Sequence, residues 1–324
     1  MARFVVWLAD VNWSQEGQVK QKMKKKRLMG LERTHTLTCR VFLIPALILC
    51  IVFVVWPLIN VVWLSFTDWD GIRDEKKFVW FDNYLQLPEM EGFTSMLIAT
   101  FTFAIGVTAL TILVAFLTAL VLDKKHKGRL PRNIMRALWF LPSLLSGTVV
   151  GILWRIMYNY NYGVINSVLD AVGLDKVNWL ETVGVTNIAI IIAGAWVQIG
   201  MCIVIFMAGL QNIPSEIYEA ATIDGATYGQ NLRYITIPMM APSITINVIT
   251  TTIAAFKAYE LPYFISKGMP GYSTLLLTGR IGFYAFQANK YGFGSALAVM
   301  LIVIIALFSL LQLIFLRRRE DIYG

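Results

Sequence analysis

The chain has 324 residues, of which 57% are hydrophobic and only 15% are charged, and its mean hydropathy is +0.63. Soluble domains are about 45–50% apolar and about 25% charged, so this chain has too few polar side chains to cover a water-facing surface. The composition excludes a disordered chain, a solenoid of charged repeats and a soluble enzyme. The net charge of +8 raises the question of a nucleic-acid partner, which the distribution of basic residues answers below.

Six apolar stretches are long enough to cross a bilayer, because about 20 helical residues span the hydrocarbon core of about 30 Å. They lack the alternation of barrel strands, so only helices satisfy their backbone groups in lipid. Pro142 and Pro242 interrupt the third and fifth stretches. We therefore predict an all-α integral membrane protein with six transmembrane helices, at residues 41–66, 96–122, 137–158, 186–210, 238–264 and 294–316.

The basic residues indicate the orientation of these spans. Nineteen lie in segments on the side of the two termini, eight lie in the opposite loops, and Lys257 falls within a span. Because Lys and Arg collect on cytoplasmic loops, both termini are predicted to be cytoplasmic, and no nucleic-acid partner is needed to explain the charge. The predicted organisation is a basic cytoplasmic segment (1–40), a transmembrane domain (41–316) and a cytoplasmic tail (317–324).

The N-terminal segment does not match a signal peptide, because its charged part is too long and the next apolar run is long enough to remain in the membrane. The short apolar run at 4–9 suggests an interfacial helix, with a disordered tail as the alternative. Cys39, Cys50 and Cys202 show neither a disulfide framework nor metal-ligand spacing, and no metal site is expected.

The loop at 211–237 has the pattern of a helix, a turn and a second helix. Pro214 suits a first helical turn, and good helix formers follow it. Gly225 permits a positive φ, and Asp224 is expected to cap the segment that follows. Ala220 and Ala221 would let another protein approach closely, while the Glu219 carboxylate would accept hydrogen bonds from a partner. The alternative is an ordinary amphipathic helix at the membrane surface.

This loop resembles the EAA motif of binding-protein-dependent ABC importer permeases, whose pattern is E-A-A, three residues, G, nine residues, I-x-L-P. Glu219-Ala220-Ala221, Gly225 and Ile235 have this spacing, and Pro238 closes it. The one departure is Ile237 in place of Leu, a change that conserves volume.

Further stretches between residues 41 and 319 resemble the carbohydrate-type (MalF/UgpA-like) permeases. They include Phe78-Val-Trp-Phe-Asp-Asn-Tyr84, with Trp80 where glycine is usual, Phe140-Leu-Pro-Ser143, Val149-Val-Gly-Ile-Leu-Trp154, Gly163-Val-Ile-Asn166, Ala208-Gly-Leu-Gln-Asn-Ile-Pro214 and Arg317-Arg318. The resemblance implies a MetI-like fold in a multi-pass protein of the bacterial inner (plasma) membrane.

The resemblance implies a non-catalytic subunit that forms half of a translocation pore. Its partners would be a second homologous permease, two ATP-binding subunits and a solute-binding protein outside the membrane. The chain lacks any Gly-Lys dipeptide and hence a P-loop, so ATP and Mg²⁺ would be bound by the partner subunits and this chain would need no cofactor. Carried over by position, Glu219, Ala220, Ala221, Asp224 and Gly225 would dock on the ATPase.

Polar residues within the spans are candidates for the substrate path. Trp196 and Gln198 lie in the fourth span, and Asn247 and Thr251 share a face of the fifth. An aromatic ring and amides suit a sugar, but hydrogen bonds between helices are the alternative role. Gly147 and Gly151 are expected to let another helix pack closely, and Lys257 and Glu260 to form a local ion pair.

The expected cargo is a carbohydrate, either a di- or oligosaccharide or a glycerol-phosphate-like solute. An acidic polysaccharide fragment such as alginate is retained as an alternative. A secondary transporter or channel is the rival function class, but the sequence lacks the repeated halves that such proteins show. A membrane enzyme would need titratable groups gathered in a pocket, which the spans almost lack.

Overall fold

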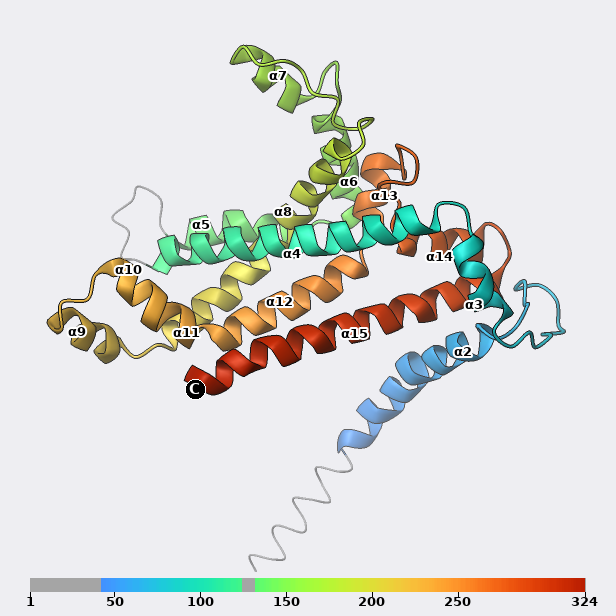
Figure 1. Cartoon of the computed structure of the whole chain (residues 1–324), viewed down its shortest axis with the longest axis horizontal. Helices are drawn as coiled ribbons and strands as arrows, with labels where there is room; N and C mark the ends of the chain where they lie inside the picture. The colour runs from blue at the N-terminus through green and yellow to red at the C-terminus, as the bar shows by residue number, and fades with distance from the viewer. Residues whose placement is uncertain (1–41, 124–131, 324) are drawn as a thin grey trace, which may run out of the picture. The chain divides into compact units, whose positions relative to one another are not determined.

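The computed structural model describes residues 42–123 and 132–323, and these form helices joined by turns (Figure 1). Within those ranges the only β-type pairing is an isolated bridge between Thr67 and Phe78. The predictions for the N-terminal segment and for most of the basic loop after the second span lie outside the described residues. The chain divides into two units, residues 1–60 and 61–324, which are described separately.

The first described helix, Phe42–Leu64, confirms the first predicted span. It contains a π-helical turn, η1 (Ile51–Val55), and continues as α2 (Trp56–Leu64). Pro57 directly follows the wide turn, and its missing N–H removes one regular helical hydrogen bond.

Four long helices form the centre of the second unit: α4 (Phe93–Asp123), α8 (Val185–Gln211), α12 (Ala241–Phe256) and α15 (Tyr291–Tyr323). Helix α4 packs against α8 and α12, and α12 also packs against α15. Gly106 on α4 faces Ile191, and Gly194 on α8 faces Val107 and Phe103. Small residues at these positions let the helices approach closely, which is how helices associate where lipid removes the hydrophobic driving force. Helix α15 continues through the predicted tail.

The third predicted span is not one helix. It consists of α5 (Arg132–Phe140), the 3₁₀ turn η3 (Leu141–Leu144) and α6 (Gly147–Met157), and its halves meet at 101°. Pro142 lies in the 3₁₀ turn, and the Ser146 hydroxyl accepts a hydrogen bond from the Val149 N–H to start α6. The bend is also held by tight packing, because a Cβ at Gly200 would meet the Trp139 backbone.

The fifth predicted span is also broken. The segment at 228–239 meets α12 at 64°, and α12 ends at Phe256 rather than at residue 264. A separate short helix, α13 (Glu260–Ser266), follows it. Four helices are therefore long and apolar enough to cross a membrane alone, and the described part of the chain reaches six spans if each bent pair counts as one.

Helix α13 packs on α6, where Gly147 and Gly151 have the predicted packing role. A Cβ at Gly151 would lie 2.7 Å from the Phe264 Cβ. The predicted ion pair between Lys257 and Glu260 is wrong. The Glu260 carboxylate instead accepts hydrogen bonds of 3.2 Å from the N–H and the hydroxyl of Thr148, at the N-terminus of α6, where the helix dipole favours an anion.

In the order of the chain, the remaining short helices come between the longer ones: α3 (Asp82–Gln86), η2 (Leu87–Glu89), α7 (Val164–Ala171) and α14 (Leu277–Phe286). Figure 1 shows α3 at the opposite end of α4 and α15 from α9 and α10. The predicted topology therefore places α3 and the turn before α15 on the side of the membrane opposite the cytoplasm.

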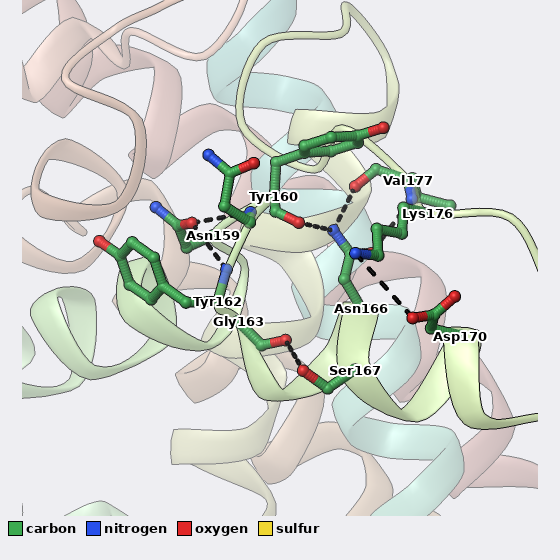
Figure 2. A network of polar contacts seen from close by, with 10 residues as sticks. Asn159, Tyr160, Tyr162, Gly163, Asn166, Ser167, Asp170, Lys176 and Val177 are labelled. Atoms are coloured by element: carbon green, nitrogen blue, oxygen red, sulfur yellow. Dashed lines mark hydrogen bonds and ion pairs between the residues drawn. The ribbon is translucent and has the colours of Figure 1, made fainter.

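Asn166 organises the loop between α6 and α8 (Figure 2). Its buried amide donates to the carbonyls of Tyr160 and Val177, and its oxygen accepts from the Val177 N–H and the Trp179 indole. A glycine is required three residues before Asn166, because a Cβ at Gly163 would collide with the Asn159 carbonyl. The Gly163–Asn166 motif thus has a structural role.

We expect Asn166→Ala to destabilise this loop by about 3 kcal/mol, because it leaves several buried donors and acceptors without partners. Limited proteolysis between α6 and α8 measures the effect, with the exposed Asn161→Ala as the matched control. Equal resistance of both variants would contradict this account of Asn166.

Candidate functional site

The candidate site is the segment that joins α8 to α12. Its first arm is α9 (Ser215–Ile223), and its second consists of α10 (Tyr228–Asn231), the π-helical η4 (Leu232–Thr236) and α11 (Ile237–Met239). Figure 1 shows α9 and α10 at the same end of the molecule as the C-terminus. The predicted helix–turn–helix arrangement is confirmed.

Gly225 ends α9 through a left-handed backbone conformation, with φ of +78°. The Gly225 N–H donates to the Thr222 carbonyl at 3.1 Å, and the Ala226 N–H donates to the Ala221 carbonyl at 2.8 Å. These two bonds form a Schellman motif, which satisfies the last carbonyls of the helix. No neighbour crowds Gly225, so glycine is favoured by the dihedral angle and not by lack of space.

Thr227, and not Asp224, caps the second arm. The Thr227 hydroxyl accepts from the Gln230 N–H, and the Gln230 side chain accepts from the Thr227 N–H at 2.7 Å, forming a capping box. Asp224 is instead the C-terminal cap residue of α9. The prediction that Asp224 caps the following helix is therefore wrong, because Gly225 and Ala226 complete the turn before the second arm begins.

Tyr218 ties the first arm to the second. Its hydroxyl lies 2.9 Å from the Thr236 hydroxyl, and its ring packs on the buried cluster that includes Leu210, Ile213 and Met240. The segment is thereby joined to the ends of both α8 and α12. Sequence reasoning missed Tyr218, although its position one residue before Glu219 turns its side chain about 100° away from Glu219 around α9.

The exposed surface of the segment combines small residues, carboxylates and one large apolar side chain. Glu219, Ala220, Asp224 and Gly225 are exposed, and Ala221 is half-buried. Ile223 is 86% exposed, which the sequence did not single out. This side chain, beside carboxylates and next to a tight turn, is accessible for contact with another protein.

The structure places Asn247 and Thr251 between α12 and α8. Asn247 is fully buried and its amide donates to the Cys202 carbonyl at 3.3 Å, while the Thr251 hydroxyl lies 3.3 Å from the Cys202 sulfur. Both side chains therefore bridge two helices of this chain. Their burial favours the alternative role, hydrogen bonding between helices, over contact with a substrate.

Trp196 and Gln198 are only half-buried. The Trp196 ring meets the Trp154 ring edge to face, with centroids 5.7 Å apart. Gln198 has no hydrogen-bond partner among the described residues. No hydrogen bond or ring contact between described residues joins this pair to Asn247 or Thr251, and the substrate-path role of all four residues stays a prediction.

Among the described residues, no group of three or more His, Cys, Asp or Glu side chains is placed to hold a metal ion. What the arrangement offers is mechanical: an exposed, capped helix joined through Tyr218 to two long helices.

Comparison with known proteins decides the family. The model of the family described as binding-protein-dependent transport system inner membrane component matches residues 111–321. The chain belongs to this family. It is therefore a membrane-embedded subunit of a transport system, and a secondary transporter, a channel or a membrane enzyme no longer fits.

Curated relatives match over nearly their whole length. The chain is 31% identical over 283 residues to the trehalose/maltose transport system permease protein MalF of Thermococcus litoralis, covering 86% of this chain and 93% of that protein. It is 34% identical over 272 residues to the multiple sugar-binding transport system permease protein MsmF of Streptococcus mutans, covering 84% and 92%. It is 31% identical over 293 residues to the arabinooligosaccharides transport system permease protein AraP of Halalkalibacterium halodurans, covering 90% and 91%.

Solved structures confirm the fold. A chain of a bacterial alginate ABC transporter, in complex with an alginate pentasaccharide-bound periplasmic protein, matches with a TM-score of 0.76 at 20% identity. The match covers 89% of this chain and 96% of that one. A second alginate transporter structure matches with a TM-score of 0.73 at 21% identity. These likenesses establish the ABC permease fold for this chain.

If this segment docks on an ATPase, as the sequence predicts, Gly225→Val is expected to lower both ATP-driven uptake and recovery of the ATPase subunit about ten-fold. The reason is that a left-handed non-glycine residue costs about 1–2 kcal/mol and a β-branched one is worst placed to adopt it. Gly225→Asn should be tolerated, since asparagine adopts this conformation. Gly229→Ala is a second control at an uncrowded glycine in the same segment. If Gly225→Val behaved like both controls, the turn would not be essential for coupling.

Proposed function

We propose that this chain is one of two permease subunits of an ATP-driven importer of a neutral di- or oligosaccharide, and that the segment at 211–237 couples it to a separate ATPase. The observation that carries the proposal is the exposed, Schellman-capped helix α9, with Glu219, Ala220 and Ile223 on an open surface. The family to which the chain belongs supports the transport role.

Coupling requires that a partner bind one conformation of the permease more tightly than another. Moving an equilibrium from 1:99 to 99:1 takes about 5.5 kcal/mol of differential binding. Closure of an ATPase dimer around ATP can supply that difference only if force on α9 reaches the membrane helices. The bond between Tyr218 and Thr236 and the apolar contacts of Tyr218 provide the connection.

In this proposal α9 docks into a cleft of the ATPase, with Ile223 as an apolar anchor and Glu219 and Asp224 facing cationic groups. Two ATP-binding subunits hold ATP and Mg²⁺, and this chain needs no cofactor. A second homologous permease completes the pore, as a heterodimer. A solute-binding protein delivers the cargo from outside the bacterial inner membrane, and the complex named for the solved alginate transporter, which includes a periplasmic protein, supports such a partner.

The carbohydrate class follows from the relatives. Trehalose, maltose and arabinooligosaccharides, the sugars in the names of two relatives at 31% identity, are uncharged. Alginate, an acidic polysaccharide, is named for the two solved transporter structures, which are only 20–21% identical to this chain. At that identity the likeness supports the fold and not the cargo. A neutral saccharide is therefore preferred, and alginate is one outcome of the test.

The test uses the full transporter in proteoliposomes with its binding protein and a panel of neutral oligosaccharides and uronic-acid oligomers. We expect one neutral sugar to stimulate ATP hydrolysis and to be taken up only with ATP. Ile223→Asp should separate the ATPase subunit from the membrane subunits, whereas Thr222→Asp, next to it on α9, is the matched control for an added charge. Uptake without nucleotide, or an unaltered complex with Ile223→Asp, would contradict the proposal.

A further inference from the structure

A cleft of about 790 Å³ lies at the end of the molecule opposite α9. One wall is formed by the segment from Asp68 to Met90, which includes α3, and the other by the end of α14, the first turn of α15 and the residues between them. Its volume is within the range of small-molecule sites, about 300–1,000 Å³. None of the candidate coupling residues or substrate-path residues lines it.

The walls of the cleft are fixed by buried contacts. The amide of Asn83, which is 7% exposed, donates 2.8 Å hydrogen bonds to the carbonyls of Ser65 and Thr67. The Gly292 N–H donates to the Trp69 carbonyl at 2.9 Å and joins the two walls. These contacts hold the two walls in place, which reduces the ordering cost of binding.

Several polar side chains that line the cleft have no partner. Asp82, Gln86 and Glu89 on one wall, and Asn289 and Lys290 on the other, make no side-chain hydrogen bond or ion pair with the described residues. These groups combine hydrogen-bond acceptors and donors on facing walls. A saccharide, with a hydroxyl on most of its carbons, offers complementary donors and acceptors in every direction.

Aromatic rings complete the lining. Tyr284 and Phe293 meet edge to face, with centroids 4.7 Å apart, and both line the cleft. Trp69 also lines it, with the Lys76 ammonium 4.4 Å from its ring centroid. Apolar ring surfaces beside free amides and carboxylates suit the C–H faces and the hydroxyls of a sugar ring respectively.

The charge of the lining disfavours an acidic ligand. Four carboxylates, of Asp68, Asp70, Asp82 and Glu89, outnumber the cations of Arg73 and Lys290. The Arg73 backbone N–H, the Arg73 guanidinium and the Ile72 N–H hold the pKa of Asp70 well below its usual range, so this carboxylate stays ionised at any physiological pH. Arg73 is already paired with Asp70, at 2.7 Å, and is therefore poorly available to an anion.

We propose that this cleft is a second carbohydrate site, which binds a neutral saccharide at the outer end of the permease. The inference takes its ligand class from the proposed function but places the sugar on the segments that precede α4 and α15 and on the first turn of α15, away from the predicted substrate-path residues. It also assigns the cleft a selectivity, because the excess of carboxylates favours neutral sugars over uronic-acid polymers. A loop of the binding protein seated in the cleft is the competing occupant.

The test measures saccharide binding to the full transporter in nanodiscs, without binding protein or nucleotide, by saturation-transfer NMR. Maltotriose is the neutral probe and trigalacturonate the acidic one. We expect maltotriose to bind and trigalacturonate to bind more weakly, with the gap narrowing as salt screens the carboxylates. The double variant Gln86→Ala/Glu89→Ala should raise the Kd for maltotriose at least about five-fold, roughly the effect of one lost hydrogen bond.

The matched control is Glu91→Ala/Gln287→Ala, which removes one carboxylate and one amide from exposed positions outside the lining. Equal binding by the two double variants, or no binding of maltotriose to the wild type, would overturn the cleft as a sugar site. So would reduced affinity for the binding protein with unchanged maltotriose binding, which would identify a protein-docking surface. Sugar uptake by the complete system is measured in parallel, because it persists if only the cleft proposal fails and is absent if the proposed function fails.

Discussion

The contact between the hydroxyls of Tyr218 and Thr236 joins the two arms of the segment at 211–237, and the proposed coupling depends on it. Without this contact, α9 would be attached to the rest of the chain only through Pro214 at one end and the Gly225 turn at the other. Force applied to the surface of α9 would then bend these two connections instead of moving the membrane helices. The 2.9 Å contact between the two hydroxyls joins both arms, and the ring of Tyr218 rests on the ends of α8 and α12. In the proposed mechanism, these contacts pass movement of α9 to the helices that cross the membrane.

The third and fifth spans are each broken by a bend, of 101° and 64° respectively. Neither span therefore crosses the bilayer as one straight helix. The break in the third span is stabilised by the close contact of Gly200 with the Trp139 backbone, and at the break in the fifth span a Cβ on Gly209 would lie 2.9 Å from the Met240 sulfur. Glu260 on α13 also accepts a hydrogen bond from the N-terminus of α6, the helix that follows the first break. Such breaks are tolerated in lipid only where neighbouring protein satisfies the freed backbone groups.

Local features of the chain could be predicted from the sequence. Pro214 and Gly225 impose backbone conformations of their own, so the helix and turn of the cytoplasmic segment follow from these residues. The apolar runs give α4 and α8 within a few residues, because length and hydropathy decide their bounds. The prolines of the third and fifth spans indicate where the breaks occur, although the angles depend on packing partners distant in the chain.

Features that depend on side chains distant in the sequence could not be predicted. Asn247 and Thr251 share one face of α12, but only the position of α8 shows that this face is buried against Cys202. Glu260 prefers Thr148, which lies 112 residues away, to nearby Lys257, because α6 presents unpaired N–H groups there. The cleft at the opposite end likewise joins segments about 200 residues apart.

The central claim is that the segment at 211–237 moves as a rigid body when the ATPase closes. Spin labels in a cysteine-free background at Ile223→Cys and Tyr234→Cys, both exposed, measure the distance between its two arms, and a pair at Ile223→Cys and Phe286→Cys measures its displacement from the opposite end. With ATP trapped in the full complex, the account predicts an unchanged first distance and a changed second one. A first distance that varies with nucleotide, or a second that does not, would contradict it.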